Sequence, residues 1–585
     1  MAGITREYLK TIIPENMPDG RELLKEGMKI GESFEARAHK FVTCRGYRTD
    51  NEYIEATKNT DRPKRFIINV GMPTLETTVQ GCVDLAVWAR ENLGVEVIGA
   101  ILPSINVGVP PELRDPTMNS NAFMMSTQED YDALNREDVF LSLGNHALAV
   151  PNALETTINC LKAGIPSIGT TSQLAWDYPG CEDHVENVAN LVRSLGIMRA
   201  HMEVGPSTTC YTEDGLASSC VDTIGFIAYY LFEHYIYEEL CGIPIQCGFG
   251  ALCSDVKTKA ALMVAVDSLK DEIGHSTLMF VHGSCTTQWD HDIEANFGSS
   301  LQEQLMMILT ETKYKTGCSL LTVPITEALR VPTMAELKHI VSAAARMTEF
   351  ADQWVDLIDW KEIEDRAEII RREGTKMFHN MMDTLEELGL DMQDPMQLLM
   401  FIKRVDSALF EVAFHPSIRE TGTFKPWFPN DMGGMTMEMV ADTVEELKQK
   451  GYTKETLKGK KAVIGSVDTH SYGIRYVDSV LESFGCKVVD IGTDNSLQAL
   501  LDTADEEGIV NIGISTHNGQ ALALADHLQK MIAERDRTYN VFMGGVLNTI
   551  LPGHTEASDV THLVEDRNII GANDMAKVIE SILAS

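Results

Sequence analysis

Short apolar runs alternate with amphipathic stretches from residue 461 to the C-terminus. Glycine or polar residues bound each run, and within the stretches between them apolar residues recur three or four positions apart. This pattern predicts a doubly wound parallel sheet, which binds ligands beyond the carboxyl ends of its strands. The predicted strands are 461–467, 487–492, 510–515, 540–545 and 568–571, and the predicted helices are 474–484, 497–507 and 522–535.

The same alternation fills the chain from about residue 65 to residue 323. About eight strand–helix units follow one another there, which favours a (β/α)8 TIM barrel over an open sheet. Polar residues collect just after several of these strands, where barrels carry their active sites. The predicted strands are 66–70, 95–102, 139–143, 167–169, 198–202, 245–248, 277–281 and 319–323, and the helices include 77–92, 153–163, 184–194, 218–239 and 256–272.

The remaining segments complete the expected organisation. Residues 336–390 show the pattern of charged amphipathic helices, whereas 414–435 are rich in proline, glycine and aromatic residues and are expected to form a loop before a short helix at 439–449. We therefore expect a helical arm at 1–60, a barrel with a helical extension at 61–437, a linker at 438–458 and a flavodoxin-like (Rossmann-type) domain at 459–585.

Composition narrows the classes of partner. The chain has 585 residues and a formal charge of −37, which argues against binding to nucleic acid or to anionic membranes. No run approaches the 18 or so apolar residues of a membrane span, and the N-terminus lacks the apolar segment of a signal peptide. We expect a cytoplasmic protein.

The motif Asp468-Thr469-His470-Ser471-Tyr-Gly473 follows directly after the predicted strand 461–467. On a strand-to-helix turn, a histidine can coordinate a metal, and an aspartate two residues earlier can accept the other ring N–H and fix the tautomer. The glycine allows the backbone to pass close to a bulky ligand. The alternative reading is a flavodoxin-like domain in which His470 is an incidental turn residue.

Two further signals follow at the ends of later strands. Ser515 ends the third predicted strand, with His517 and Gly519 just beyond it, and Gly544-Gly545 end the fourth. With the first motif, these residues resemble the cobalamin-binding domain whose pattern is D-x-H-x-x-G, then S-x-L, then G-G. The leucine of that pattern is His517 here, which either puts a polar group near the cofactor's tail or reflects a wider pocket.

The cobalamin resemblance assigns roles to these residues. It implies that His470 is the lower axial ligand of cobalt, with Asp468 as its partner and Thr469 and Ser471 beside it. It also implies that Ser515 bonds the buried benzimidazole tail, for which Gly544 and Gly545 leave room. Gly473, His517 and Gly519 complete the expected cofactor-binding set.

The barrel resembles the catalytic subunit of glutamate mutase (methylaspartate mutase), here fused to the cobalamin domain. The segments that carry this resemblance are Gln288-Trp289, 295–298, 327–333 and 429–433. The resemblance implies an adenosylcobalamin cofactor, with Glu327 at its ribose, and a pair of barrels in a homodimer.

The substrate site departs from that family. Three arginines hold the substrate's carboxylates there, but the matching stretches 71–75, 103–109 and 143–146 contain no arginine, and Arg114 lies a few residues beyond the second. Without bidentate partners a dicarboxylate is held poorly. We expect a smaller or less charged carboxylic acid than glutamate. The candidate pocket residues are Asn145, His146, Thr171, Arg114 and Glu327, although His146 is equally read as a histidine that closes a strand.

Two other functions use the same kind of domain. A corrinoid methyltransferase combines it with a barrel, but usually places a small helical bundle directly before it. A cobalamin sensor or carrier would not need a barrel with polar strand ends. The sequence therefore predicts an adenosylcobalamin-dependent isomerase, with methyl transfer and sensing as the alternatives.

Overall fold

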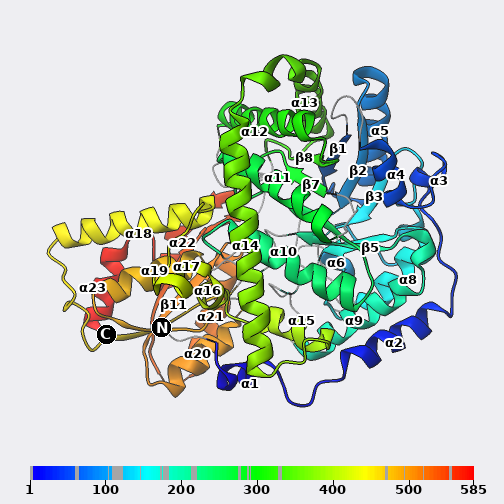
Figure 1. Cartoon of the computed structure of the whole chain (residues 1–585). Coiled ribbons are helices and arrows are strands. Elements are labelled where there is room, and N and C mark those ends of the chain that lie inside the picture. The colour runs from blue at the N-terminus through cyan, green and yellow to red at the C-terminus, as the bar shows by residue number, and fades with distance from the viewer. Residues whose placement is uncertain are drawn as a thin grey trace. The chain divides into compact units, whose positions relative to one another are not determined.

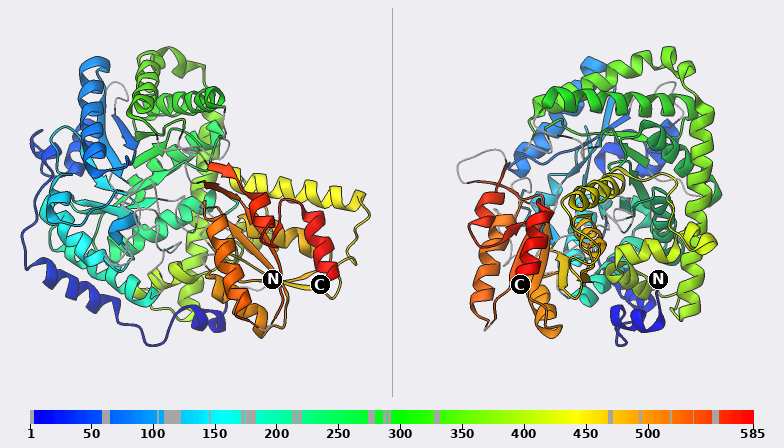
Figure 2. Two further views of the ribbon diagram at one scale, coloured as in Figure 1. Left: turned by 180° about the vertical axis from the view of Figure 1, so that it is seen from behind. Right: turned by 90° about the vertical axis from the view of Figure 1, so that its left-hand side faces the viewer.

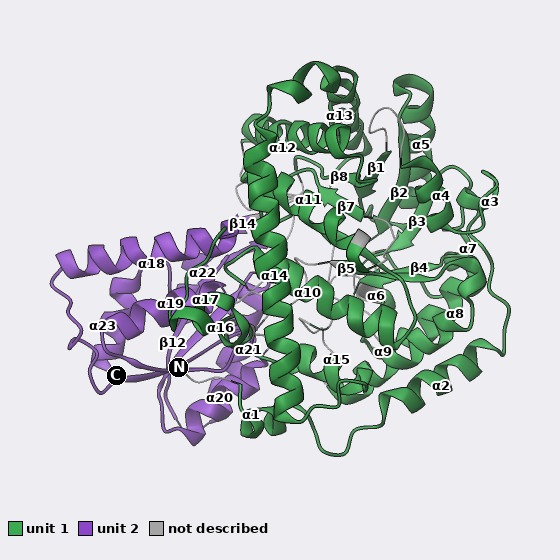
Figure 3. Ribbon diagram, viewed as in Figure 1, with its two compact units in different colours: residues 1–405, 409–428 green, residues 406–408, 429–585 purple. Residues whose placement is uncertain are grey.

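The computed structural model describes residues 4–58, 65–102, 105–108, 123–144, 147–170, 174, 183–211, 216, 220–273, 279–285, 289, 292–326, 332–467, 472–492, 495–517, 519–535, 537–551 and 557–585. The chain divides into two compact units (Figure 3). The first comprises residues 1–405 and 409–428, and the second comprises residues 406–408 and 429–585.

The first unit contains a closed barrel of eight parallel strands, as the sequence predicted (Figure 1). Each strand pairs with the next, and β1 closes the barrel against β8, where Ile67 lies beside Leu321. The strands are β1 (Arg65–Asn69), β2 (Glu96–Leu102), β3 (Phe140–Leu143), β4 (Ser167–Thr170), β5 (Ser207–Tyr211), β6 (Ile245–Phe249), β7 (Met279–His282) and β8 (Ser319–Thr322).

The predicted fifth strand, 198–202, is wrong. Residues up to Arg199 continue helix α9 (His184–Arg199), and the strand is β5, which starts at Ser207. Leu191, Leu195 and Met198 are all buried, and their spacing of four and three residues is helical. A short apolar run does not by itself distinguish a buried helix from a strand.

Helices surround the barrel. The long helix α14 (Trp360–Leu388) lies against α10 (Ile224–His234) and α11 (Val256–Ile273), as Figure 1 shows. At the periphery, α2 (Gly20–Gly31) packs along α9 (Figure 2). The others are α5 (Leu75–Leu93), α6 (Ile105–Gly108), α7 (Gln128–Asp132), α8 (Ala153–Ala163), α12 (Ile293–Tyr314), α13 (Met334–Trp354), α15 (Pro395–Arg404), α16 (Ser407–Phe414) and α17 (Pro416–Thr421), with short helical turns at Met202–Val204, Tyr235–Leu240 and Val355–Leu357.

The N-terminal arm closes the base of the barrel. Besides α1 (Arg6–Ile12) and α2, it contains α3 (Lys40–Thr43) and α4 (Asp50–Thr57). Phe41 and Tyr53 of the arm join an apolar cluster with Phe280 inside the barrel. The carboxylate of buried Asp50 accepts a hydrogen bond from Gln246 Nε2 of β6 at 3.2 Å. Burial raises the pKa of Asp50 to about 6.

The second unit is a doubly wound sheet of five parallel strands in the order β10-β9-β11-β12-β15. Apolar residues alternate along β9, so that Val463 packs on one face of the sheet and Ile464 on the other. The elements are α18 (Asp431–Gln449), β9 (Lys461–Ser466), α19 (Tyr472–Ser483), β10 (Lys487–Asp490), α20 (Leu497–Glu506), β11 (Asn511–Thr516), α21 (Ala521–Ala533), β12 (Asn540–Gly545), a hairpin of β13 (Asn548–Ile550) and β14 (Ala557–Asp559), α22 (Thr561–Glu565), β15 (Ile570–Gly571) and α23 (Met575–Ala584).

The expected loop at 414–435 is wrong in part, because α17 and the start of α18 lie within it. Asn430 caps α18 by accepting the N–H of Gly433 at 2.7 Å, which starts the helix ahead of the predicted 439. The helix then packs on α19, with Leu447 buried, so it belongs to the second unit, whereas the sequence assigned 438–458 to a linker. Among the described helices, none is both long and apolar enough to cross a membrane.

Candidate cofactor site and barrel mouth

Three predicted cofactor-binding segments meet at one edge of the second unit's sheet. Ser515 of β11 lies between Ser466 of β9 and Gly544 of β12 in the strand register. Val467, the residue before the first motif, donates its N–H to the carbonyl of Ser515 at 3.1 Å. Because parallel strands end at the same edge, sequence spacing was enough to predict that these segments would lie together.

Gly473, near the start of α19, lies against Ser515. A Cβ atom at Gly473 would lie only 2.3 Å from Ser515 Oγ, so no side chain fits there unless Ser515 moves. Gly545 is equally confined, because it has a left-handed φ of 93° and its Cβ would lie 2.2 Å from the carbonyl oxygen of Thr516. Gly519 also has a left-handed φ, 69°, in the turn after β11.

A narrow hollow opens between these elements. Its walls are mainly apolar and include Ile474, Val477 and Phe542 beside Gly473, Ser515 and Gly544. Ser515 is 3% exposed, and its Oγ has no hydrogen-bond partner among the described residues. A buried hydroxyl that is left without a partner is costly, so this position suits a ligand that bears a hydrogen-bonding atom on a flat apolar group.

The described residues include only part of the predicted cofactor set. They place Gly473, Ser515, His517, Gly519, Gly544 and Gly545 along the strand ends. The motif residues Asp468, Thr469, His470 and Ser471 lie outside the described residues, so axial ligation by His470 stays a prediction.

The same segment has a counterpart among known proteins. Residues 462–569 match the family described as the B12 binding domain. This part of the chain is a B12-binding domain. Three features of this sheet edge suit a cobalamin whose nucleotide tail enters it. They are the apolar hollow, the Ser515 hydroxyl without a partner, and the closely packed glycines.

Other comparisons add little to this assignment. No curated protein matches the chain. Two solved structures cover about half of it at 14% identity: dihydropteroate synthase (DHPS) of Yersinia pestis with a pterine-sulfa conjugate (TM-score 0.27, 50% of this chain and 94% of that one) and dihydropteroate synthase of Xanthomonas albilineans with 4-aminobenzoic acid (TM-score 0.29, 51% and 93%).

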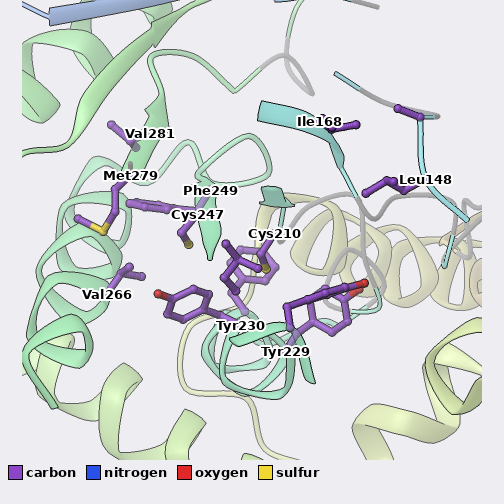
Figure 4. Packing of buried hydrophobic residues seen from close by; sticks show 14 of the residues in the cluster. Leu148, Ile168, Cys210, Tyr229, Tyr230, Cys247, Phe249, Val266, Met279 and Val281 are labelled. Atoms are coloured by element: carbon purple, nitrogen blue, oxygen red, sulfur yellow. The ribbon is translucent and has the colours of Figure 1, made fainter. Parts of the chain in front are cut away.

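In the first unit, the carboxyl end of β7 presents a histidine to the barrel interior. Figure 4 shows Met279 and Val281 of β7 in the core outside the strands, whereas Phe280 packs inside the barrel. Because side chains alternate along a strand, His282 shares the inward side with Phe280. Burial and the nearby Lys259 ammonium lower the pKa of His282 to about 3, so the imidazole is neutral at physiological pH.

A buried ion pair grips the turn that follows His282. Lys259 Nζ of α11 lies 2.5 Å from Glu303 Oε2 of α12 and donates to the carbonyl of His282 at 3.1 Å. Glu303 in turn accepts the N–H of Cys285 at 2.9 Å. The polar residues that follow the predicted strands did not predict this pair. A lysine among the buried apolar positions of the helix at 256–272 was the available signal.

The residues just before α10 are held in a similar way. The buried carboxylate of Asp222 accepts the N–H of Trp427 at 2.6 Å and lies 3.2 Å from His415 Nε2. The carboxylate of Glu411 accepts the N–H of Asp222 at 2.9 Å. The helical extension after the barrel thus braces the residues that lead into α10. The predicted substrate residues Asn145, His146, Thr171, Arg114 and Glu327 lie outside the described residues.

Proposed function

We propose that this protein is an adenosylcobalamin-dependent radical isomerase, a carbon-skeleton mutase that acts on a small amino, hydroxy or branched carboxylic acid other than glutamate. The choice of isomerase over methyl carrier rests on the segment that leads into the B12-binding domain. Described residues 429–460 contain a single helix, α18, which packs beside α19. A methyl carrier usually has a small helical bundle directly before this domain.

His470 is the residue that would hold cobalt from below, with Asp468 as acceptor for its second ring nitrogen and Thr469 and Ser471 next to it. Ser515 would donate its orphaned hydroxyl to the tail's base, and Gly473, Gly544 and Gly545 would leave the tail its path. Adenosylcobalamin supplies a carbon radical that removes hydrogen from the substrate, which is chemistry that side chains do not provide.

The barrel's part is to bind the acid, orient it and keep water away from the radicals. Neutral His282 offers one donor and one acceptor at the mouth, and the Lys259–Glu303 pair fixes its backbone. Asn145, His146, Thr171 and Arg114 are the proposed substrate contacts, and Glu327 would hold the adenosyl ribose. A substrate of lower charge than glutamate follows from the missing arginines.

The deciding experiment is EPR on anaerobic protein loaded with adenosylcobalamin and frozen after mixing with pools of amino, hydroxy and branched acids. A cob(II)alamin signal coupled to an organic radical, together with 5′-deoxyadenosine formation, is the expected result. The matched control is the His470→Ala protein, which should give neither. If the protein instead demethylates methylcobalamin and forms no deoxyadenosine with any pool, methyl transfer would be established. Cofactor binding with neither reaction would favour a sensor.

We further propose that the protein works in the cytoplasm as a homodimer whose partners are its cofactor and a small carboxylic acid, with no nucleic acid or membrane. The formal charge of −37 supports the last two exclusions. Sedimentation of the purified protein tests the dimer.

A further inference from the structure

His517 lies beside the hollow, next to one of the glycines that line it. Its Cε1 atom lies 3.0 Å from the position that a Cβ would take at Gly545, and 3.4 Å from the corresponding position at Gly473. The imidazole therefore lies between the two glycines that confine the site. It follows Ser515 by two residues, but it does not belong to the wall of the hollow.

The electrostatic surroundings of His517 favour the binding of an anion. Gly473 is the second residue of α19, a helix of 12 residues, so the ring lies near the positive end of that helix. The chain as a whole carries a formal charge of −37, so an anionic group that approaches this edge needs local donors. The side chain of His517 is partly exposed and its imidazole can donate an N–H, whereas the neighbouring hollow is mainly apolar.

We propose that His517 donates a hydrogen bond to the phosphodiester in the nucleotide tail of the cobalamin, and so makes this domain selective for corrinoids that carry that phosphate. The inference rests on the proposed mode of binding, in which the tail enters the hollow. In that mode Ser515 would hold the base, and His517 would hold the phosphate. The cobalamin-domain pattern has leucine at the position of His517. A leucine side chain has no donor, so this contact is specific to a chain with histidine there.

The test compares three ligands that differ only in the tail: cobinamide, which lacks it, cobinamide phosphate, which ends at the phosphate, and cobalamin. Their dissociation constants are measured on the full chain by absorbance titration for the wild type and for His517→Leu, His517→Asn and the control His527→Leu, an exposed histidine on α21. We expect His517→Leu to bind cobalamin and cobinamide phosphate about tenfold to a hundredfold more weakly and to bind cobinamide as before. The amide of His517→Asn should recover part of the loss.

Three outcomes would overturn the assignment. Unchanged cobalamin affinity in His517→Leu would exclude any contact with the tail. Equal weakening for all three ligands would show a general effect on the domain. Weakening for cobalamin but not for cobinamide phosphate would put the contact at the base. The proposed function fails in a different way, since a wild type that binds cobinamide and cobalamin equally well would show that the tail does not enter the hollow.

Discussion

Lys259 Nζ lies 2.5 Å from Glu303 Oε2, and both side chains are buried under the turn that ends β7. The pair holds both ends of this turn, because Lys259 donates to the carbonyl of His282 and Glu303 accepts the N–H of Cys285. A buried charge destabilises the fold unless an opposite charge neutralises it, so the contributions of Lys259 and Glu303 to stability should be coupled.

Replacing one member of this pair should destabilise the fold more than replacing both. Lys259→Met and Glu303→Met each leave one charge buried without its partner, and each should lower the free energy of unfolding by about 3–5 kcal/mol. The double variant replaces both with apolar groups and should recover most of that loss. Urea unfolding followed by tryptophan fluorescence measures this. Lys361→Met, in the exposed pair with Asp365, is the control and should leave stability nearly unchanged. A double variant as unstable as the sum of the singles would contradict the coupling.

Gly473→Ala should impair cobalamin binding without unfolding the barrel. The added methyl would lie 2.3 Å from Ser515 Oγ, so the Ser515 side chain, which lines the hollow, would have to move. We expect at least a tenfold rise in the cobalamin dissociation constant, measured by absorbance titration. Gly434→Ala on α18 is the control, since its Cβ would meet only Pro429 at an ordinary 3.8 Å.

Ser515→Ala distinguishes the loss of the Ser515 hydroxyl from the clash between Ser515 and the new methyl group at position 473. Alone, it removes the hydroxyl proposed to meet the tail's base and should weaken binding several-fold. Combined with Gly473→Ala, it also removes the atom that the new methyl strikes, so the double variant should bind better than the product of the single effects predicts. Independent effects would argue against the clash.

His470→Ala should weaken cobalamin binding and abolish turnover while the barrel stays folded. The expectation follows from the Asp468–His470 motif, in which we propose that the imidazole ligates cobalt and the carboxylate orients it. Absorbance titration gives the affinity, and circular dichroism checks the fold. Near-normal activity in this variant would remove the axial-ligand assignment.

Asp50 should make the first unit less stable as the pH rises. Its pKa rises from 3.8 to about 6 on burial, so the folded chain holds a proton that the unfolded chain has released between these values. Stability from this group is therefore complete below about pH 3.8 and is lost as the pH rises through 6. Asp50→Asn cannot release this proton, so the free energy of unfolding of the variant relative to the wild type should rise by about 1 kcal/mol between pH 5 and pH 8. Urea unfolding at both values measures it; a difference independent of pH would contradict the buried protonated state.

The errors of sequence interpretation arise where a local pattern fits more than one element. Residues 198–202 were predicted as a strand from the alternation along the chain, yet they end or follow α9, because a local pattern does not reveal which neighbours its residues will meet. In the segment 414–435, proline and glycine suggested a loop, but Pro416 occupies the first turn of α17, where proline is tolerated.

The sequence by itself determined the barrel, the B12-binding domain, most of their strands and helices, and the edge where Ser515 and Gly544 meet. Periodicity and spacing carry that information, because parallel strands share a direction and end together. Only the tertiary structure decided that Gly473 touches Ser515, that His517 stands between two glycines, and that Lys259 finds Glu303 under His282. Those contacts join residues from different elements, and they depend on how helices pack on strands, which no local pattern encodes.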